Sequence, residues 1–210
     1  MNRQSVGRVR QMRSAPMKAD PLPDERLLDA HLQGDDEAFG VLYDRYDRQC
    51  FHFIRRLLGS AQGAAAEDLH QETWEAVALK GRSYAAAKAS FGTWLLTIAR
   101  NKVLDHFRRQ KVAVLVSAEE AVEAGLELAD PSQTPPDRVQ SREMAMAMIL
   151  AVERLPLVQR EAFLLFAEGG LSLEEIAQAT DVGIETAKSR LRYARSSLRV
   201  SLASWRPDHG

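Results

Sequence analysis

The chain has 210 residues, of which 45% are hydrophobic, and its 28 basic and 29 acidic residues give a net charge of −1. This length allows one or two domains with buried cores, and the single cysteine excludes an internal disulfide or a cysteine-based zinc site. No apolar run is as long as a membrane span, and the N-terminus lacks the apolar core of a signal peptide. We therefore expect a cytoplasmic protein without membrane insertion.

The N-terminal half is predicted to form a helical domain over residues 23–112, preceded by a disordered basic arm over residues 1–22. Asp35 or Asp36 is expected to cap a long second helix. Cys50 lies within the apolar stripe of that helix and is predicted to be a buried thiol. Helical periodicity and end signals place the helices of this half at residues 24–32, 36–58, 64–79 and 91–110.

Charge is distributed unevenly along the second half of the chain. Residues 94–111 carry five basic residues against one acid, and residues 188–206 carry six basic residues and no acid. Between them, residues 112–143 hold seven acidic residues against two basic ones. This pattern indicates two basic helices that face nucleic acid, separated by an acidic connector. We predict a flexible acidic linker over residues 113–137 and a second helical domain over residues 138–206.

Residues 171–195 have the pattern of a helix-turn-helix. Ser172 and Glu175 form a capping box, which predicts a helix start, and Asp181 lies at the turn, where a left-handed backbone is needed. The following helix has apolar residues at helical spacing on one face and basic residues elsewhere. Such a helix fits the major groove of DNA. The alternative is a solvated basic surface helix, which the coincidence of cap, turn and apolar stripe disfavours.

Three further blocks, residues 66–74, 91–101 and 155–163, precede this motif. In this order they resemble the extracytoplasmic-function (ECF) group of bacterial sigma factors, from about residue 24 to residue 202. The resemblance implies an all-α protein of two small helical domains, with no catalytic activity, cofactor or metal. The implied partners are bacterial core RNA polymerase, promoter DNA and an anti-sigma factor, and the implied role is transcription initiation in a stress response.

The resemblance also implies three sets of site residues. The polar face of the third helix would bind the clamp helices of core polymerase, through Asp68, Gln71, Glu72 and Glu75. The loop over residues 81–90 would capture an unpaired base, and its aromatic residue Tyr84 is the candidate for stacking on that base. The −10 element would be bound by Tyr84, Asn101, Lys102, Asp105, His106, Arg108 and Arg109. The −35 element would be bound by Ser172, Glu174, Thr186, Lys188, Ser189, Arg190, Arg192 and Tyr193.

Two apolar features have competing interpretations. Trp94 is expected to pack in the core rather than to act as a wedge in DNA melting. Leu164, Leu165 and Phe166 are expected to be core residues, with a seat for the polymerase flap as the alternative.

Two rival functions can be stated. An autonomous helix-turn-helix regulator explains residues 171–195 but leaves the acidic face of the third helix and the block at residues 91–101 without a role. Such a regulator would bind duplex DNA specifically without polymerase, usually as a symmetric dimer. An enzyme is disfavoured because the sequence shows no nucleophile constellation, metal cluster or phosphate-binding loop.

Overall fold

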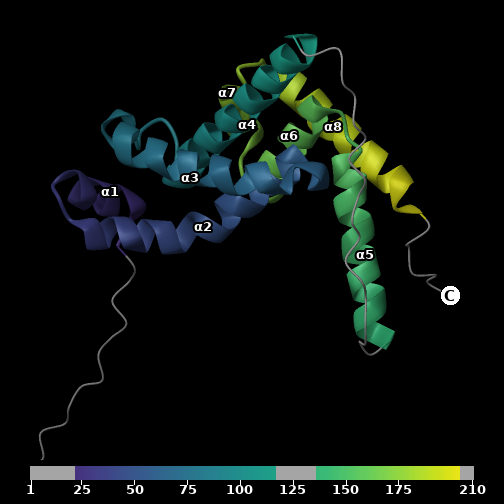
Figure 1. Ribbon diagram of the computed structural model, residues 1–210, viewed down its shortest axis with the longest axis horizontal. Coiled ribbons are helices and arrows are strands. Elements are labelled where there is room, and N and C mark those ends of the chain that lie inside the picture. Colours follow the sequence, from purple (N-terminus) through teal and green to yellow (C-terminus); the bar gives the residue numbers. More distant parts are fainter. Residues whose placement is uncertain (1–21, 117–135, 204–210) are drawn as a thin grey trace, which may run out of the picture.

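The computed structural model describes residues 22–116 and 136–203. Within these two ranges all regular structure is helical, which confirms the predicted all-α class (Figure 1). No helix in these ranges is long and apolar enough to cross a membrane. The predicted N-terminal arm, apart from Leu22, and most of the predicted linker lie outside the described residues.

The first domain is built around one long central helix. Asp35 caps this helix, accepting a hydrogen bond from the backbone N–H of Ala38 at 3.1 Å, and Gly59 ends it with a φ of 92°. The helix packs against the three other helices of its domain, and its inward face buries Leu42, Phe53 and Ile54. The helices are α1 (Asp24–Leu32), α2 (Asp36–Leu58), α3 (Gly63–Lys80) and α4 (Phe91–Val116).

The second domain contains the predicted helix-turn-helix. The capping box is present: the side chain of Ser172 accepts from the backbone N–H of Glu175 at 3.2 Å, and Glu175 accepts from the backbone N–H of Ser172 at 2.9 Å. Asp181 adopts the left-handed conformation, with φ 53° and ψ 51°. The helices are α5 (Pro136–Glu153), α6 (Leu157–Ala167), α7 (Leu173–Thr180) and α8 (Ile184–Ser201).

Both helices that border the linker are longer than predicted. Helix α4 continues to Val116 rather than ending at residue 110, because residues 111–116 contain neither glycine nor proline. Helix α5 begins at Pro136, which was assigned to the linker. Proline is compatible with the first position of a helix, since the backbone N–H that it lacks would have no intrahelical partner there.

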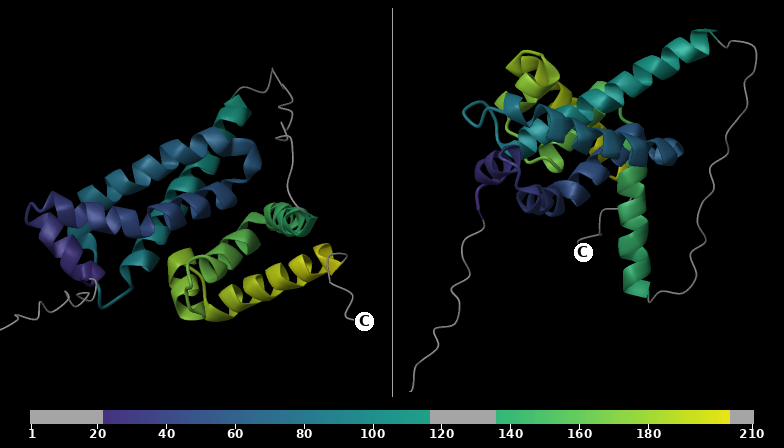
Figure 2. Two further views of the ribbon diagram at one scale, coloured as in Figure 1. Left: turned by 90° about the horizontal axis from the view of Figure 1, so that it is seen from below. Right: turned by 60° about the vertical axis from the view of Figure 1, so that its left-hand side comes forward.

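The two domains contact each other directly (Figures 1 and 2). Helix α2 packs against α5 and α6, and α4 packs against α7. Buried side chains of both domains belong to one continuous apolar cluster. Polar contacts border it: Ser60 donates from its backbone N–H and its hydroxyl to the Glu153 carboxylate, each at 2.9 Å. The guanidinium of Arg160 donates to the carbonyl of Leu57 at 3.1 Å. The domains therefore form a closed arrangement that the sequence did not predict.

Cys50 is fully buried in α2, as predicted. Burial disfavours the thiolate and, together with the nearby Asp47 carboxylate, raises the pKa of Cys50 to about 12. The thiol is thus a small apolar core group at neutral pH.

Candidate nucleic-acid interface

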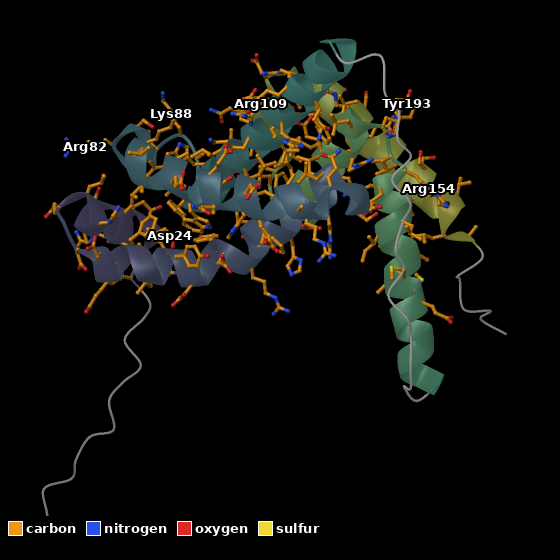
Figure 3. The ribbon with its side chains drawn as sticks, viewed as in Figure 1. Asp24, Arg82, Lys88, Arg109, Arg154 and Tyr193 are labelled. Atoms are coloured by element: carbon orange, nitrogen blue, oxygen red, sulfur yellow. The ribbon has the colours of Figure 1, made fainter. Side chains whose placement is uncertain are left out.

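Helix α8 presents a buried stripe and a free polar surface. Ala187, Leu191, Ala194 and Leu198 are buried, as the sequence predicted. Tyr193 is 52% exposed and lies on the outer surface of the domain (Figure 3). The remaining side chains predicted to read the −35 element are exposed or, for Ser189 and Arg190, half-buried; the exposed ones are Ser172, Glu174, Thr186, Lys188 and Arg192. All of them lie on α8 or at the start of α7, so the structure brings this set together.

A basic groove runs along one flank of α8. It has a volume of about 370 Å³ and is bordered by Leu173 at the start of α7. Arg195 and Arg199, which were not predicted as site residues, lie in this groove one and two turns beyond Arg192. Helical spacing from Lys188 would have found them. The four basic side chains of the groove are Lys188, Arg192, Arg195 and Arg199. Such a row of cations suits a phosphate backbone.

The three apolar residues near the end of α6 differ in burial. Leu164 and Leu165 are buried and belong to the core, as expected. Phe166 is 40% exposed, so its assignment to the core was wrong. The guanidinium of Arg195 lies over the Phe166 ring, 4.4 Å from its centroid, a favourable cation–π geometry. Phe166 therefore packs against one of the four cations of the groove.

The candidate −10 surface on α4 differs because most of its polar side chains have partners within the chain. Lys102 donates to the Glu72 carboxylate on α3 at 2.8 Å. This hydrogen bond, with the charge of Lys102, lowers the pKa of Glu72 below its usual value of 4.5. Arg108 pairs with Asp105 at 2.7 Å on the exposed side of α4. Asn101 is exposed and accepts from Arg100 at 2.9 Å.

His106 is tied into an amide cluster at the end of the first domain. Its Nε2 lies 2.9 Å from Oε1 of Gln62 and 2.9 Å from Nε2 of Gln110. One edge of the ring therefore faces two amides from different segments, and its Nε2 donates to Gln62 or accepts from Gln110, depending on the tautomer. This arrangement gives His106 a role in joining α4 to the turn after α2.

The predicted polymerase-binding and −10 sets meet in a groove between α3 and α4. The groove has a volume of about 370 Å³ and is lined by Asp68 and Glu72 from one set and by His106 and Arg109 from the other. Arg109 projects from the ribbon near the upper edge of α4 (Figure 3). Gln71 and Glu75 are exposed on α3 and hydrogen-bonded to each other at 3.0 Å. The sequence did not predict that the two sets would be adjacent.

Tyr84 lies inward, in the loop between α3 and α4. Its ring is half-buried against Phe91 and Trp94, with centroid separations of 6.0 and 5.3 Å. Its hydroxyl donates to the carbonyl of Ala89 at 3.1 Å, and burial raises the pKa of Tyr84 to about 12. Trp94 packs against the core, as expected. The side chains that project from this loop are instead Arg82 and Lys88, which the sequence analysis did not select (Figure 3).

The described residues contain no group of three or more His, Cys, Asp or Glu side chains placed to hold a metal ion. The chemistry of the exposed surfaces is that of binding: basic side chains for DNA and an acidic helix face for a basic partner.

Comparison with known proteins assigns a family to each domain. Residues 42–112 match the Sigma-70 region 2 family and residues 145–198 match Sigma-70, region 4. The ECF RNA polymerase sigma factor SigM of Mycobacterium tuberculosis is 31% identical over 83% of this chain and 82% of its own length. SigW of Bacillus subtilis is 29% identical over 81% of this chain and 91% of its own. BldN of Streptomyces coelicolor is 33% identical over 72% of this chain, which spans only 55% of that relative.

Solved structures give the same fold. The sigma factor RpoE of Bartonella quintana, crystallised with the anti-sigma factor NepR, superposes with a TM-score of 0.64 and 26% identity, over 80% of this chain and 98% of RpoE. CnrH, solved with the cytosolic domain of CnrY, superposes with a TM-score of 0.59 at 23% identity, over 86% of this chain and 97% of CnrH.

The matched regions define a sigma-70-type transcription factor with a −10 domain and a −35 domain. The chain belongs to the ECF RNA polymerase sigma factors. It is a promoter-specific initiation factor, and RNA synthesis is the chemistry of the core polymerase rather than of this chain. The match to region 2 decides against an autonomous regulator, which would have no use for that domain.

Proposed function

We propose that this ECF factor divides its contacts among the surfaces described above. The acidic face of α3 binds core polymerase, α4 and the loop over residues 81–90 engage the −10 element, and α8 reads the −35 element. The observation that carries the proposal is the basic groove beside α8, in which four cations open to solvent on a helix-turn-helix. The domain boundaries at residues 23–112 and 138–206 are part of the same proposal.

The proposal has two further parts, a regulatory partner and a cellular location. RpoE and CnrH were each solved with a protein partner, and RpoE's partner is an anti-sigma factor. We infer that an anti-sigma factor also regulates this chain. Because its target is RNA polymerase, we expect it to act in the cytoplasm.

The polymerase-binding face can be tested by a double substitution. Asp68→Ala with Gln71→Ala removes a charge and an amide from the exposed face of α3 without touching the core. We expect loss of co-elution with core polymerase, while helical content and melting temperature stay unchanged. The exposed Glu37 of α2, replaced by alanine, is the matched control. Normal co-elution of the double variant would contradict the assignment of this face.

Promoter use is tested by run-off transcription with core polymerase on fragmented genomic DNA, with the RNA 5′ ends sequenced. New start sites that share two spaced upstream elements are expected. Specific duplex binding by the chain alone, without new start sites, would contradict the proposed division of contacts.

A further inference from the structure

Phe166 is an aromatic residue at the surface of the second domain. It lies in the last turn of α6, is 40% exposed and stands outside the buried apolar cluster that its neighbours Leu164 and Leu165 join. The backbone at this point is fixed, because the carbonyl of Phe166 accepts from the N–H of Gly170 at 3.2 Å in the turn that leads to α7. The ring is therefore attached to a defined position beside α8.

The ring lies against one cation of the basic groove. The guanidinium of Arg195 lies over the Phe166 ring, 4.4 Å from its centroid. Arginine suits this contact because its planar, weakly hydrated guanidinium packs well on an aromatic face. Arg192 also lies over a ring, at 5.1 Å, but that ring belongs to the adjacent and exposed Tyr193 of the same helix. The contact of Arg195 instead joins two helices and so fixes this cation relative to the domain.

The position of Arg195 along α8 favours a contact to the DNA backbone. Helix α8 begins at Ile184, so Arg195 lies about three turns into it. In a helix-turn-helix the N-terminal residues of the recognition helix contact base edges. Contacts to phosphates, which carry no sequence information, position the protein on the duplex. Arg195 lies beyond the first turns and in a groove with three other cations, as a phosphate-binding side chain would.

A ring is a suitable support for a side chain that must later bind a phosphate. An arginine that is free in solvent loses rotamer freedom when it binds, and this loss weakens binding. A guanidinium that already rests on a ring has lost part of that freedom beforehand. The ring also carries no charge, so it does not compete with the phosphate as a carboxylate would. The contact therefore orders Arg195 without neutralising it.

We propose that Phe166 is a positioning residue for −35 binding, which acts by holding Arg195 ready for a DNA phosphate. The inference rests on the proposed role of α8 and extends the −35 site to α6, outside the helix-turn-helix itself. It has two consequences. Loss of the ring weakens DNA binding by a similar factor whatever the sequence of the −35 element, and it does so only while Arg195 is present.

A double-mutant cycle in the assembled holoenzyme tests the first residue through the second. The full chain with core polymerase binds a promoter recovered by sequencing of RNA 5′ ends, with its −35 element intact or scrambled, over a range of salt concentrations. Arg195→Ala is expected to reduce affinity about tenfold. It should also lower the slope of log affinity against log salt concentration by about 1. Phe166→Leu is expected to reduce affinity about two- to tenfold on both fragments.

Conservative variants separate the ring from its bulk and the guanidinium from its charge. Phe166→Tyr keeps the ring and should bind as the parent does. Arg195→Lys keeps the charge but loses the planar fork, so it should lose about as much affinity as Phe166→Leu. In the Arg195→Ala background, Phe166→Leu should have no further effect. Val158→Ala removes another exposed apolar side chain of α6 and is the matched control. Circular dichroism checks that each variant is folded.

Additive losses in the cycle would overturn the proposal, because the ring would then act independently of Arg195, as an apolar contact for a protein partner would. Parental affinity of a folded Phe166→Leu variant would also overturn it, as would a loss confined to the intact −35 element. If Phe166→Leu does not fold, parental affinity of Arg195→Lys overturns the proposal instead. Equal affinity of the parent holoenzyme for the intact and scrambled fragments would contradict the proposed role of α8 itself.

Discussion

The two candidate DNA surfaces of this ECF factor differ in how far their side chains are already engaged. On α8, the interactions of the candidate readers with the rest of the chain are weak: Lys188 reaches Glu185 at 3.4 Å, and Arg192 lies over the neighbouring Tyr193 ring. On α4, Lys102 is bonded to Glu72 at 2.8 Å, and Nε2 of His106 lies 2.9 Å from each of two amides, one of which it can bond. The candidate −35 surface is therefore open, whereas Lys102 and His106 of the candidate −10 surface would exchange internal partners for DNA.

This difference has an energetic meaning. A side chain that is free in the unbound protein gains the full value of a DNA contact, less the cost of ordering it. A side chain that is already paired gains only the difference between its two partners. Substitutions on α8 should therefore be more costly to promoter use than comparable substitutions on α4.

The largest effect is expected on α8. Arg192→Ala and Lys188→Ala should each weaken −35-dependent initiation by about 1–3 kcal/mol, because no internal contact of similar strength is lost in exchange. Initiation rates measured on promoters with an intact and a scrambled −35 element separate this effect from general damage. The exposed Ser197 of the same helix, replaced by alanine, is the control. Full activity of both variants would contradict the proposal that α8 reads the −35 element.

A smaller effect is expected on α4. Lys102→Ala should weaken promoter opening by about 1 kcal/mol or less, because the DNA contact competes with an existing, partly exposed ion pair. Permanganate reactivity of unpaired thymines in the −10 region reports opening. Lys80→Ala, at the exposed end of α3, serves as the control. If Lys102→Ala lost as much promoter function as Arg192→Ala, the two surfaces would contribute equally to DNA binding. The difference inferred from their internal contacts would then be wrong.

The smallest expected effect is a shift in the pKa of Glu72. Lys102 holds the pKa of Glu72 below 4.5, so the pair stabilises the folded chain above that pH and loses its contribution as the pH falls through the lower folded value. Carbon-13 NMR of the Glu72 carboxyl should show this depressed pKa. Lys102→Met should raise it toward 4.5. A Glu72 carboxyl that titrates identically in the parent and in Lys102→Met would show that the pair does not form in solution.

The helix-turn-helix was predictable because its signals are local. A capping box spans four residues, and a left-handed turn depends on the conformational tolerance of one residue, here Asp181. The apolar stripe of α8 follows from helical geometry alone. The proline-led start of α5 was missed because proline marks both linkers and helix N-termini, and the sequence does not separate these two uses.

The closed arrangement could not be predicted because its contacts join positions far apart in the chain. Arg100 and Glu161 are separated by 61 residues, and periodicity shows that a position is buried without showing what covers it. Tyr84 illustrates the same limit within one domain. An aromatic residue in a loop suggested stacking on a base, but in the structure the ring packs against Phe91 and Trp94.

The burial of Cys50 has a consequence for signalling. Peroxides and electrophiles react with thiolates, and burial, which raises the pKa of Cys50 to about 12, keeps this thiol protonated at neutral pH. Since this is the single cysteine of the sequence, the folded chain has no thiol suited to sensing oxidants directly. A cysteine introduced at the surface would therefore be the one thiol of the folded chain that a thiol-reactive label can reach.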